Sequence, residues 1–120
     1  MSIQAVLNFF SNLLSKFRGN NRIYNSLVYV EGLIPKIGPF IKIAGDIIVG
    51  LVPTEVDDAA WAIIKGKYPH LFDGSKLNQD TLKLYALGIT TDLVQYHFPE
   101  ASTTVARTAT QLAYLIQKNK

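Results

Sequence analysis

Two histidines, His70 and His97, are the side chains of this sequence best suited to proton transfer near neutral pH. A zinc site needs three or four ligands, and because the chain has no cysteine, these histidines would need carboxylates to complete one. Asp57 and Asp58 form a close acidic pair, but negative charge is also what the start of a helix favours. We therefore predict no metal site and no cofactor.

Nucleophilic catalysis has no local signature in the sequence. Serine, threonine, histidine and aspartate are all present, but no GxSxG elbow occurs. Gly45 and Gly50 lack both the GxGxxG spacing and the Walker lysine of phosphate-binding loops. His97 stands between two aromatic residues in a predicted helix end, and His70 follows a proline in a predicted loop. We predict that the protein is not an enzyme and has no catalytic residue.

Length and composition indicate one folded domain over residues 1–120, since domains usually hold ~100–200 residues. Hydrophobic residues make up 48% of the chain, which supplies a core and is too much for a disordered chain. The mean hydropathy of +0.16 is high for so small a protein, so we expect some apolar surface to stay uncovered. Residues 1–53 form an apolar, mildly basic half with five basic and two acidic side chains, whereas residues 54–120 carry seven of each.

The clearest secondary-structure prediction is an amphipathic helix over residues 2–18. Ser2 is a suitable cap for its start, and Gly19 is typical of a helix end. Large apolar residues recur there at the period of one helix face, and polar residues fill the other face. The apolar stripe is Ile3, Val6, Leu7, Phe10, Leu13, Leu14 and Phe17, with Phe9 beside it, and the polar face is Gln4, Asn8, Ser11, Asn12, Ser15 and Lys16.

The next part of the chain gives less certain patterns. A polar turn is predicted at residues 20–22. Residues 23–34 fit either a strand or a helix, and we favour a helix because four apolar residues share one helical face and no partner strand is evident. A break follows between Pro35 and Pro39, and residues 40–52 predict a largely buried helix that Pro53 ends.

Three further helices are predicted in the second half of the chain. Thr54 is expected to cap a helix that closes at Gly66, with Val56, Ala60, Ile63 and Ile64 facing inward. A loop over residues 67–78 separates it from a helix over 81–98 that Asp80 caps, and the last helix is expected over 100–117. The predicted fold is an all-α, compact bundle of five or six short helices in a single domain.

Neither a spanning helix nor a signal peptide is predicted. The longest apolar stretch, residues 40–52, contains Lys42 and Asp46 and is shorter than the ~20 residues that cross a bilayer. A signal peptide carries positive charge before its apolar run, whereas the first charged side chain here, Lys16, follows the run. We therefore expect synthesis in the cytoplasm.

Basic residues gather at the end of the first predicted helix, as Lys16, Arg18 and Arg22. The isoelectric point of 9.2 just reaches the range typical of nucleic-acid-binding domains. The helix predicted over 81–98, however, carries the single lysine Lys83, which makes it a poor recognition helix. Nucleic acid is therefore not the partner we expect.

The leading functional hypothesis is a non-enzymatic structural or interaction protein, such as an accessory component of a virion, whose N-terminal helix docks onto a protein partner or onto its own copies. The alternative is a membrane-active or membrane-peripheral protein, lysis-related (holin-like) or pore-associated, that uses residues 2–18 and 40–52. A second alternative is a small apolar-ligand carrier or enzyme with a pocket lined by Trp61, Tyr85 and Tyr96. The predicted contact residues are Ile3, Val6, Leu7, Phe9, Phe10, Leu13, Leu14, Lys16, Phe17, Arg18 and Arg22.

Overall fold

The computed structural model describes residues 8, 12, 15, 16, 19, 21–52 and 54–118, with only the backbone at 21–24 and 118. Every regular element in these residues is a helix, which confirms the predicted all-α bundle. The elements are α2 (Asn21–Leu33), the 3-10 helix η1 (Ile34–Lys36), α3 (Gly38–Ile48), α4 (Asp58–Lys67), the 3-10 helix η2 (Pro69–Leu71), α5 (Gln79–His97) and α6 (Thr103–Lys118).

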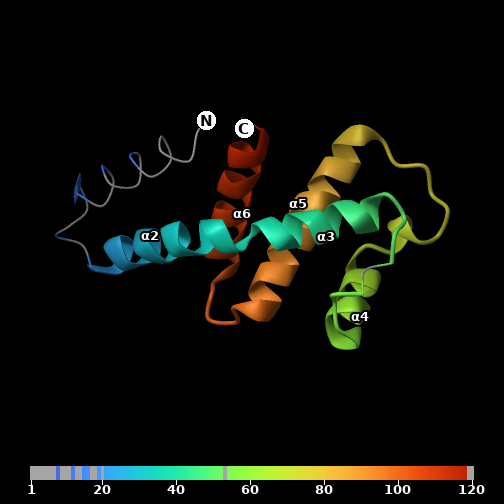
Figure 1. Cartoon of the computed structure of the whole chain (residues 1–120), viewed down its shortest axis with the longest axis horizontal. Coiled ribbons are helices and arrows are strands. Elements are labelled where there is room, and N and C mark those ends of the chain that lie inside the picture. The colour runs from blue at the N-terminus through green and yellow to red at the C-terminus, as the bar shows by residue number, and fades with distance from the viewer. Residues whose placement is uncertain are drawn as a thin grey trace.

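A long rod made of α2, η1 and α3 crosses the molecule, because these helices follow one another end to end (Figure 1). The helix α6 packs against α2 and η1, whereas α5 packs against α3 and also against α6. The short helix α4 contacts α5 and lies toward the end of the rod where α3 stops. The start of α2 and the end of α3 therefore lie at opposite ends of the rod.

The two prolines at the predicted break divide this rod without ending it. Pro35 lies in the first turn of η1 and Pro39 in the first turn of α3, where a missing N–H leaves no intrahelical hydrogen bond unmade. Between them, Ile37 is fully buried, and its backbone N–H donates to the Ile34 carbonyl at 3.3 Å. The chain therefore continues through residues 34–38 as a tight helical turn.

Two apolar clusters hold the helices together. The first joins the rod to α6 and has Val30, Leu33, Ile37, Ile41, Val94, Ala101, Ala106, Ala109, Ala113 and Ile116 as its buried members. The second joins α3, α4 and α5 through Ile43, Ala44, Ile47, Ala60, Ile64, Ile89 and Leu93. Phe40 is partly buried against both clusters. Each large side chain buried in this way contributes roughly 1.5–3 kcal/mol to stability.

The helices of the second half begin at other residues than the sequence suggested. The cap of α4 is Asp57 and not Thr54, because the Asp57 carboxylate accepts the Ala60 N–H at 2.8 Å. The cap of α5 is Asn78 and not Asp80, since its side-chain oxygen accepts the Thr81 N–H at 2.8 Å. At the last helix, which begins at Thr103 instead of residue 100, the hydroxyl of Ser102 accepts the Val105 N–H at 3.2 Å.

Three predictions about burial and boundaries are also corrected. Residues 23–34 are helical as favoured, but α2 already begins at Asn21, so no polar turn occurs at 21–22. The helix predicted over 40–52 ends at Ile48, and the residues beyond it are exposed. In α4, Ala60 and Ile64 are buried as expected, whereas Ile63 is 44% exposed, although it lines a small cavity between α4 and α5.

Candidate functional site

The predicted N-terminal contact surface falls mostly outside the described residues. These are Ile3, Val6, Leu7, Phe9, Phe10, Leu13, Leu14, Phe17 and Arg18. Arg22 lies in α2, where only its backbone is described. Lys16 is helical and exposed, and so are Asn8, Asn12 and Ser15, which belong to the predicted polar face. The described positions of this segment thus agree with a helix whose polar side faces the solvent.

The end of α3 presents three large aliphatic side chains to the solvent. Val49, Leu51 and Val52 are 72%, 58% and 74% exposed. Together with Gly50 they form what we name the α3 tip (Val49, Gly50, Leu51 and Val52). The apolar pattern predicted a largely buried helix over these residues, although Gly50, a residue typical of helix ends, indicates that the helix stops before them.

A Schellman motif fixes the conformation of the α3 tip. Gly50 adopts a φ of 89°, which glycine reaches without steric cost, and its N–H donates to the Ile47 carbonyl at 3.1 Å. The Leu51 N–H donates to the Asp46 carbonyl at 2.8 Å. In this motif the residue after the glycine usually packs on the helix residue five or six positions earlier. Here those positions hold Asp46 and Gly45, so Leu51 has no apolar side chain to cover it within the motif.

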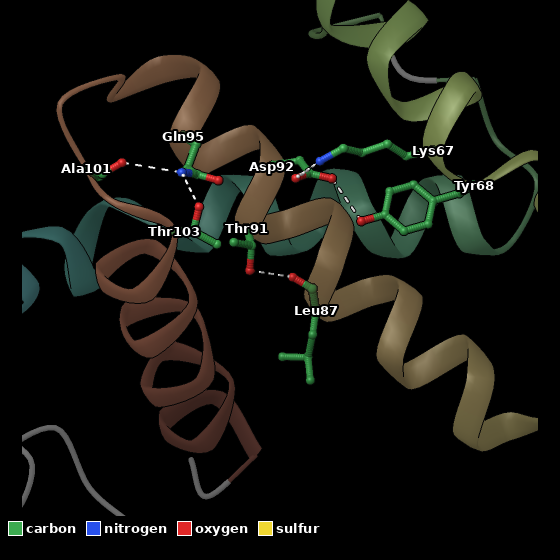
Figure 2. Close-up of polar contacts among 8 residues, drawn as sticks. All are labelled: Lys67, Tyr68, Leu87, Thr91, Asp92, Gln95, Ala101 and Thr103. Atoms are coloured by element: carbon green, nitrogen blue, oxygen red, sulfur yellow. Dashed lines mark hydrogen bonds and ion pairs between the residues drawn. The ribbon is translucent and has the colours of Figure 1, made fainter.

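A polar clamp centred on Asp92 joins α4 to the middle of α5 (Figure 2). One oxygen of the Asp92 carboxylate accepts from the Lys67 ammonium at 2.9 Å, and the other accepts from the Tyr68 hydroxyl at 2.8 Å. The Asp92 side chain is 13% exposed, whereas the Lys67 side chain is 58% exposed, so the carboxylate is mostly desolvated and the ammonium is not. On the opposite side of the same view, the Gln95 amide donates to Thr103 at 3.2 Å and fixes the turn between α5 and α6.

The Tyr68 hydroxyl is a hydrogen-bond donor in this clamp. Burial and the hydrogen bond to Asp92 both raise the pKa of Tyr68, so the phenol keeps its proton. Its ring lies against Tyr85, with 5.3 Å between the ring centroids, and its hydroxyl lies directly over Gly88. The phenol therefore serves as a donor that ties the end of α4 to α5.

A second polar contact ties the start of α4 to the end of α5. The Tyr96 hydroxyl donates to the Asp57 carboxylate, with distances of 2.9 and 3.1 Å to its two oxygens. The backbone N–H of Ala60 and the hydroxyl of Tyr96 lower the pKa of Asp57, because both stabilise its ionised form. The α4 helix is therefore held to α5 by polar contacts at both of its ends.

His70, Asp73 and Ser75 come together in the loop after α4 but do not form a catalytic triad. The Nδ1 atom of His70 lies 3.0 Å from Asp73 and 3.4 Å from the Ser75 hydroxyl, so one ring nitrogen faces both partners. A triad needs the carboxylate on one ring nitrogen and the nucleophile on the other. All three residues are exposed, and Asp73 also accepts the backbone N–H of Ser75 at 2.9 Å, which is a local turn contact.

His97 also has a packing role in the structure. Its ring stacks on Phe40 of α3, with centroids 5.0 Å apart and an angle of 14° between the planes. Tyr96 meets the same ring edge-on at 5.4 Å. No group of three or more histidine and acidic side chains that could hold a metal ion occurs within residues 21–52 and 54–118 or at the other described positions.

The aromatic residues proposed for an apolar pocket have separate neighbours. Trp61 packs edge-on against Phe72, with centroids 5.5 Å apart, whereas Tyr85 lies against Tyr68. A small apolar cavity between α4 and α5 takes Tyr96 as a lining residue but neither Trp61 nor Tyr85. Its volume of about 10 Å³ holds about one water molecule, so this cavity is too small for an organic ligand.

Comparison with protein family models, with curated proteins and with solved structures finds no match to this chain. No described helix is both long enough and apolar enough to cross a membrane. Of the surfaces described above, the α3 tip is the one that presents three neighbouring aliphatic side chains to the solvent next to a backbone turn held by hydrogen bonds.

Proposed function

We propose that this protein is a non-enzymatic structural or interaction protein that docks onto a protein partner or onto its own copies through its amphipathic N-terminal helix. Membership of a larger assembly, such as a virion, would be in keeping with this role. The observation that carries the proposal is the exposure of Val49, Leu51 and Val52 in a chain whose helices already enclose two apolar clusters. Apolar surface held out in a fixed conformation is typical of a contact site.

The N-terminal segment supports the same role. Asn8, Asn12, Ser15 and Lys16 are helical and exposed, so the polar face of the expected helix is on the solvent side. Its apolar stripe would then cover either the body of the same chain or a second molecule. A helix with one apolar stripe is the element that most often fills a groove on a partner.

The polar clusters give no support to an enzymatic role. The Asp92 carboxylate is engaged by Lys67 and Tyr68, and His70 meets its serine and aspartate through a single ring nitrogen. These contacts fix helices and turns. The Ser75 hydroxyl lies 3.4 Å from Nδ1 of His70, but Asp73 meets the same ring nitrogen and so does not orient the histidine from its other side as a catalytic third group would.

Light scattering coupled to size-exclusion chromatography tests the proposal. We expect the purified protein to have a mass above the 13.3 kDa of one chain and to dissociate in the Phe10→Asp variant. Asn12→Asp is the matched control, since it places the same charge on the exposed polar face of the segment. We expect it to leave the mass unchanged.

Two results would count against the proposal. A monomeric wild type that co-sediments with liposomes and loses this binding on Phe10→Asp would favour the membrane-peripheral alternative. Loss of helical circular dichroism in Phe10→Asp, with the wild type monomeric, would place Phe10 in the core of its own chain and remove the docking surface.

A further inference from the structure

We propose that the α3 tip binds the apolar, basic N-terminal segment of a second copy of this chain, so that copies associate head to tail. The inference rests on the proposed function and names the partner of the docking helix. Three observations carry it, namely the uncovered side chains of the tip, the distribution of charge, and the distance between the two surfaces within one chain.

The uncovered side chains are a fixed feature of the fold. Leu51 is 58% exposed because the residues it would normally pack on in its Schellman motif are Asp46 and Gly45. The backbone hydrogen bonds of Gly50 and Leu51 fix the backbone at these two residues, so a partner does not have to order this part of the tip on binding. A preformed apolar surface of this kind suits a helix that brings its own apolar stripe.

The charges around the two surfaces are complementary. Between Lys42 and Lys65 the sequence has no basic residue, whereas Asp46, Glu55, Asp57 and Asp58 are acidic. Lys42 pairs with Asp46 at 3.1 Å and also interacts electrostatically with Glu55. Asp57 accepts from Tyr96 at the end of α5, so the acidic border of the tip consists of Glu55 and Asp58, which follow the tip in the chain and are exposed. The segment before Glu31 has no acidic residue and contains Lys16, Arg18 and Arg22. Opposite charges of this kind favour and orient an encounter between the two surfaces.

The same charges make an anionic membrane a poor partner for the tip. Lipid surfaces in cells carry net negative charge and attract basic segments. Glu55 and Asp58 follow the tip closely in the chain and would be repelled by such a surface. A basic protein helix therefore fits the acidic border of the tip better than an anionic membrane does.

The basic residues of the N-terminal segment, Lys16, Arg18 and Arg22, cannot reach the tip of their own chain. The rod from Asn21 to Ile48 measures about 42 Å at ~1.5 Å per helical residue, and it runs without a reversal (Figure 1). Lys16 lies five residues before the rod, a distance that spans about 18 Å even when fully extended. Arg22 is part of the first turn of α2. A contact between these basic residues and the acidic border of the tip must therefore join two molecules.

In a head-to-tail pair, one copy contributes its tip and the other its N-terminal segment. One N-terminal segment and one tip therefore stay free at the two ends of the pair. Such contacts continue into a ring if the rotation between copies closes, and into an open filament if it does not. A symmetric dimer formed by two N-terminal helices would leave both tips without a role. The two arrangements respond differently to substitutions in the tip, which makes them separable by experiment.

The test uses two variants that each block one surface. Leu51→Asp places a charge in the tip at an exposed position, and Phe10→Asp places one in the N-terminal stripe. Leu84→Asp is the matched control, because Leu84 is a leucine on α5 that is 67% exposed. If Phe10→Asp fails to fold, the double variant Lys16→Glu, Arg18→Glu replaces it, since Lys16 is exposed.

Light scattering on each variant alone and on their mixture gives the answer. We expect Leu51→Asp and the N-terminal variant to be monomers when measured alone, and their equimolar mixture to contain a species of twice 13.3 kDa. Leu84→Asp should associate as the wild type does. The mixture forms a pair because each variant keeps the one surface that the other has lost, and the pair cannot extend.

The failure of this inference is distinct from the failure of the proposed function. If Leu51→Asp still associates while the N-terminal variant is monomeric, the helix docks elsewhere, and the head-to-tail contact is wrong although self-association stands. A monomeric mixture of two variants that each keep their helical circular dichroism would also overturn it. Binding of the wild type to phosphatidylglycerol vesicles that Leu51→Asp abolishes, without self-association in solution, would assign the tip to a lipid surface instead.

Discussion

Replacing Gly88 by alanine is expected to destabilise the protein, although alanine is the better helix former. A Cβ atom at position 88 would lie 2.4 Å from the hydroxyl oxygen of Tyr68 and 3.2 Å from the ring carbon that carries it. The hydroxyl must therefore move by roughly 1 Å to reach an ordinary van der Waals distance of about 3.4–4 Å. Because the same hydroxyl donates to Asp92 at 2.8 Å, this movement breaks the hydrogen bond.

The magnitude follows from two opposing effects. Loss of a hydrogen bond to a charged acceptor costs about 1.5–3 kcal/mol. The change from glycine to alanine in a helix interior returns about 0.8–1 kcal/mol. The free energy of unfolding should therefore fall by about 0.5–2 kcal/mol, which corresponds to a shift of roughly 0.3–1 M in the urea midpoint for a chain of this size.

Urea denaturation followed by far-UV circular dichroism measures this change, with Gly45→Ala as the control. Gly45 is also inside a helix, and nothing lies within 4 Å of a Cβ placed there, so its substitution should raise the stability. In a Tyr68→Phe background the hydrogen bond is already absent, and Gly88→Ala should then cost less than in the wild type. If Gly88→Ala stabilises the protein as much as Gly45→Ala does, the Tyr68 hydroxyl is not held over Gly88.

Two further predictions concern the core and the acid response. Leu93→Ala, at a fully buried position of the second cluster, should lower the free energy of unfolding by about 2–5 kcal/mol in urea denaturation. Leu84→Ala, on the exposed side of the same helix, should change it by less than about 0.5 kcal/mol, and equal effects would contradict the assigned faces of α5. The pKa of Asp57 is lowered from 3.8, so its contribution to stability is present above that value and is lost as the pH falls through the folded-state pKa. Thermal melts from neutral pH to below 3.8 should therefore show a smaller loss of stability in Tyr96→Phe than in the wild type, and an identical loss would mean that Tyr96 does not help to hold Asp57 ionised.

The helical fold was predictable because local patterns and tertiary contacts agree over most of the chain. Residues 23–34 were the ambiguous case, since tyrosine and valine favour strands. The spacing of Leu27, Val30 and Ile34 matches the surface that these residues bury, partly or fully, against α6 and η1. Burial of one helical face against a neighbouring helix therefore makes residues 23–34 helical, although their intrinsic propensities alone favour neither helix nor strand clearly.

Helix starts were predicted less well, because several residues in each case were suitable caps. Thr54 and Asp57 lie near the start of one helix, and Asn78 and Asp80 lie near the start of another. All four residues are of types that favour helix starts or their first turn. The tertiary contact of Asp57 with Tyr96 adds a second bond to one of these candidates. That contact joins residues 39 positions apart, so it is not visible in a local pattern.

The candidate site was the least predictable part, and the reason lies in the residues just before the tip. A run of apolar residues from 47 to 52 reads as a continuation of a buried helix when burial is judged from composition alone. Gly50 ends the helix two residues after Ile48, and the two positions that would cover Leu51 are filled by Asp46 and Gly45. Leu51 is therefore exposed because neither of these two positions carries an apolar side chain that could cover it. To predict an exposed tip from the sequence, Gly50 has to be considered together with Gly45 and Asp46. Neither the helix-ending glycine nor the two positions alone distinguish an exposed tip from a packed one.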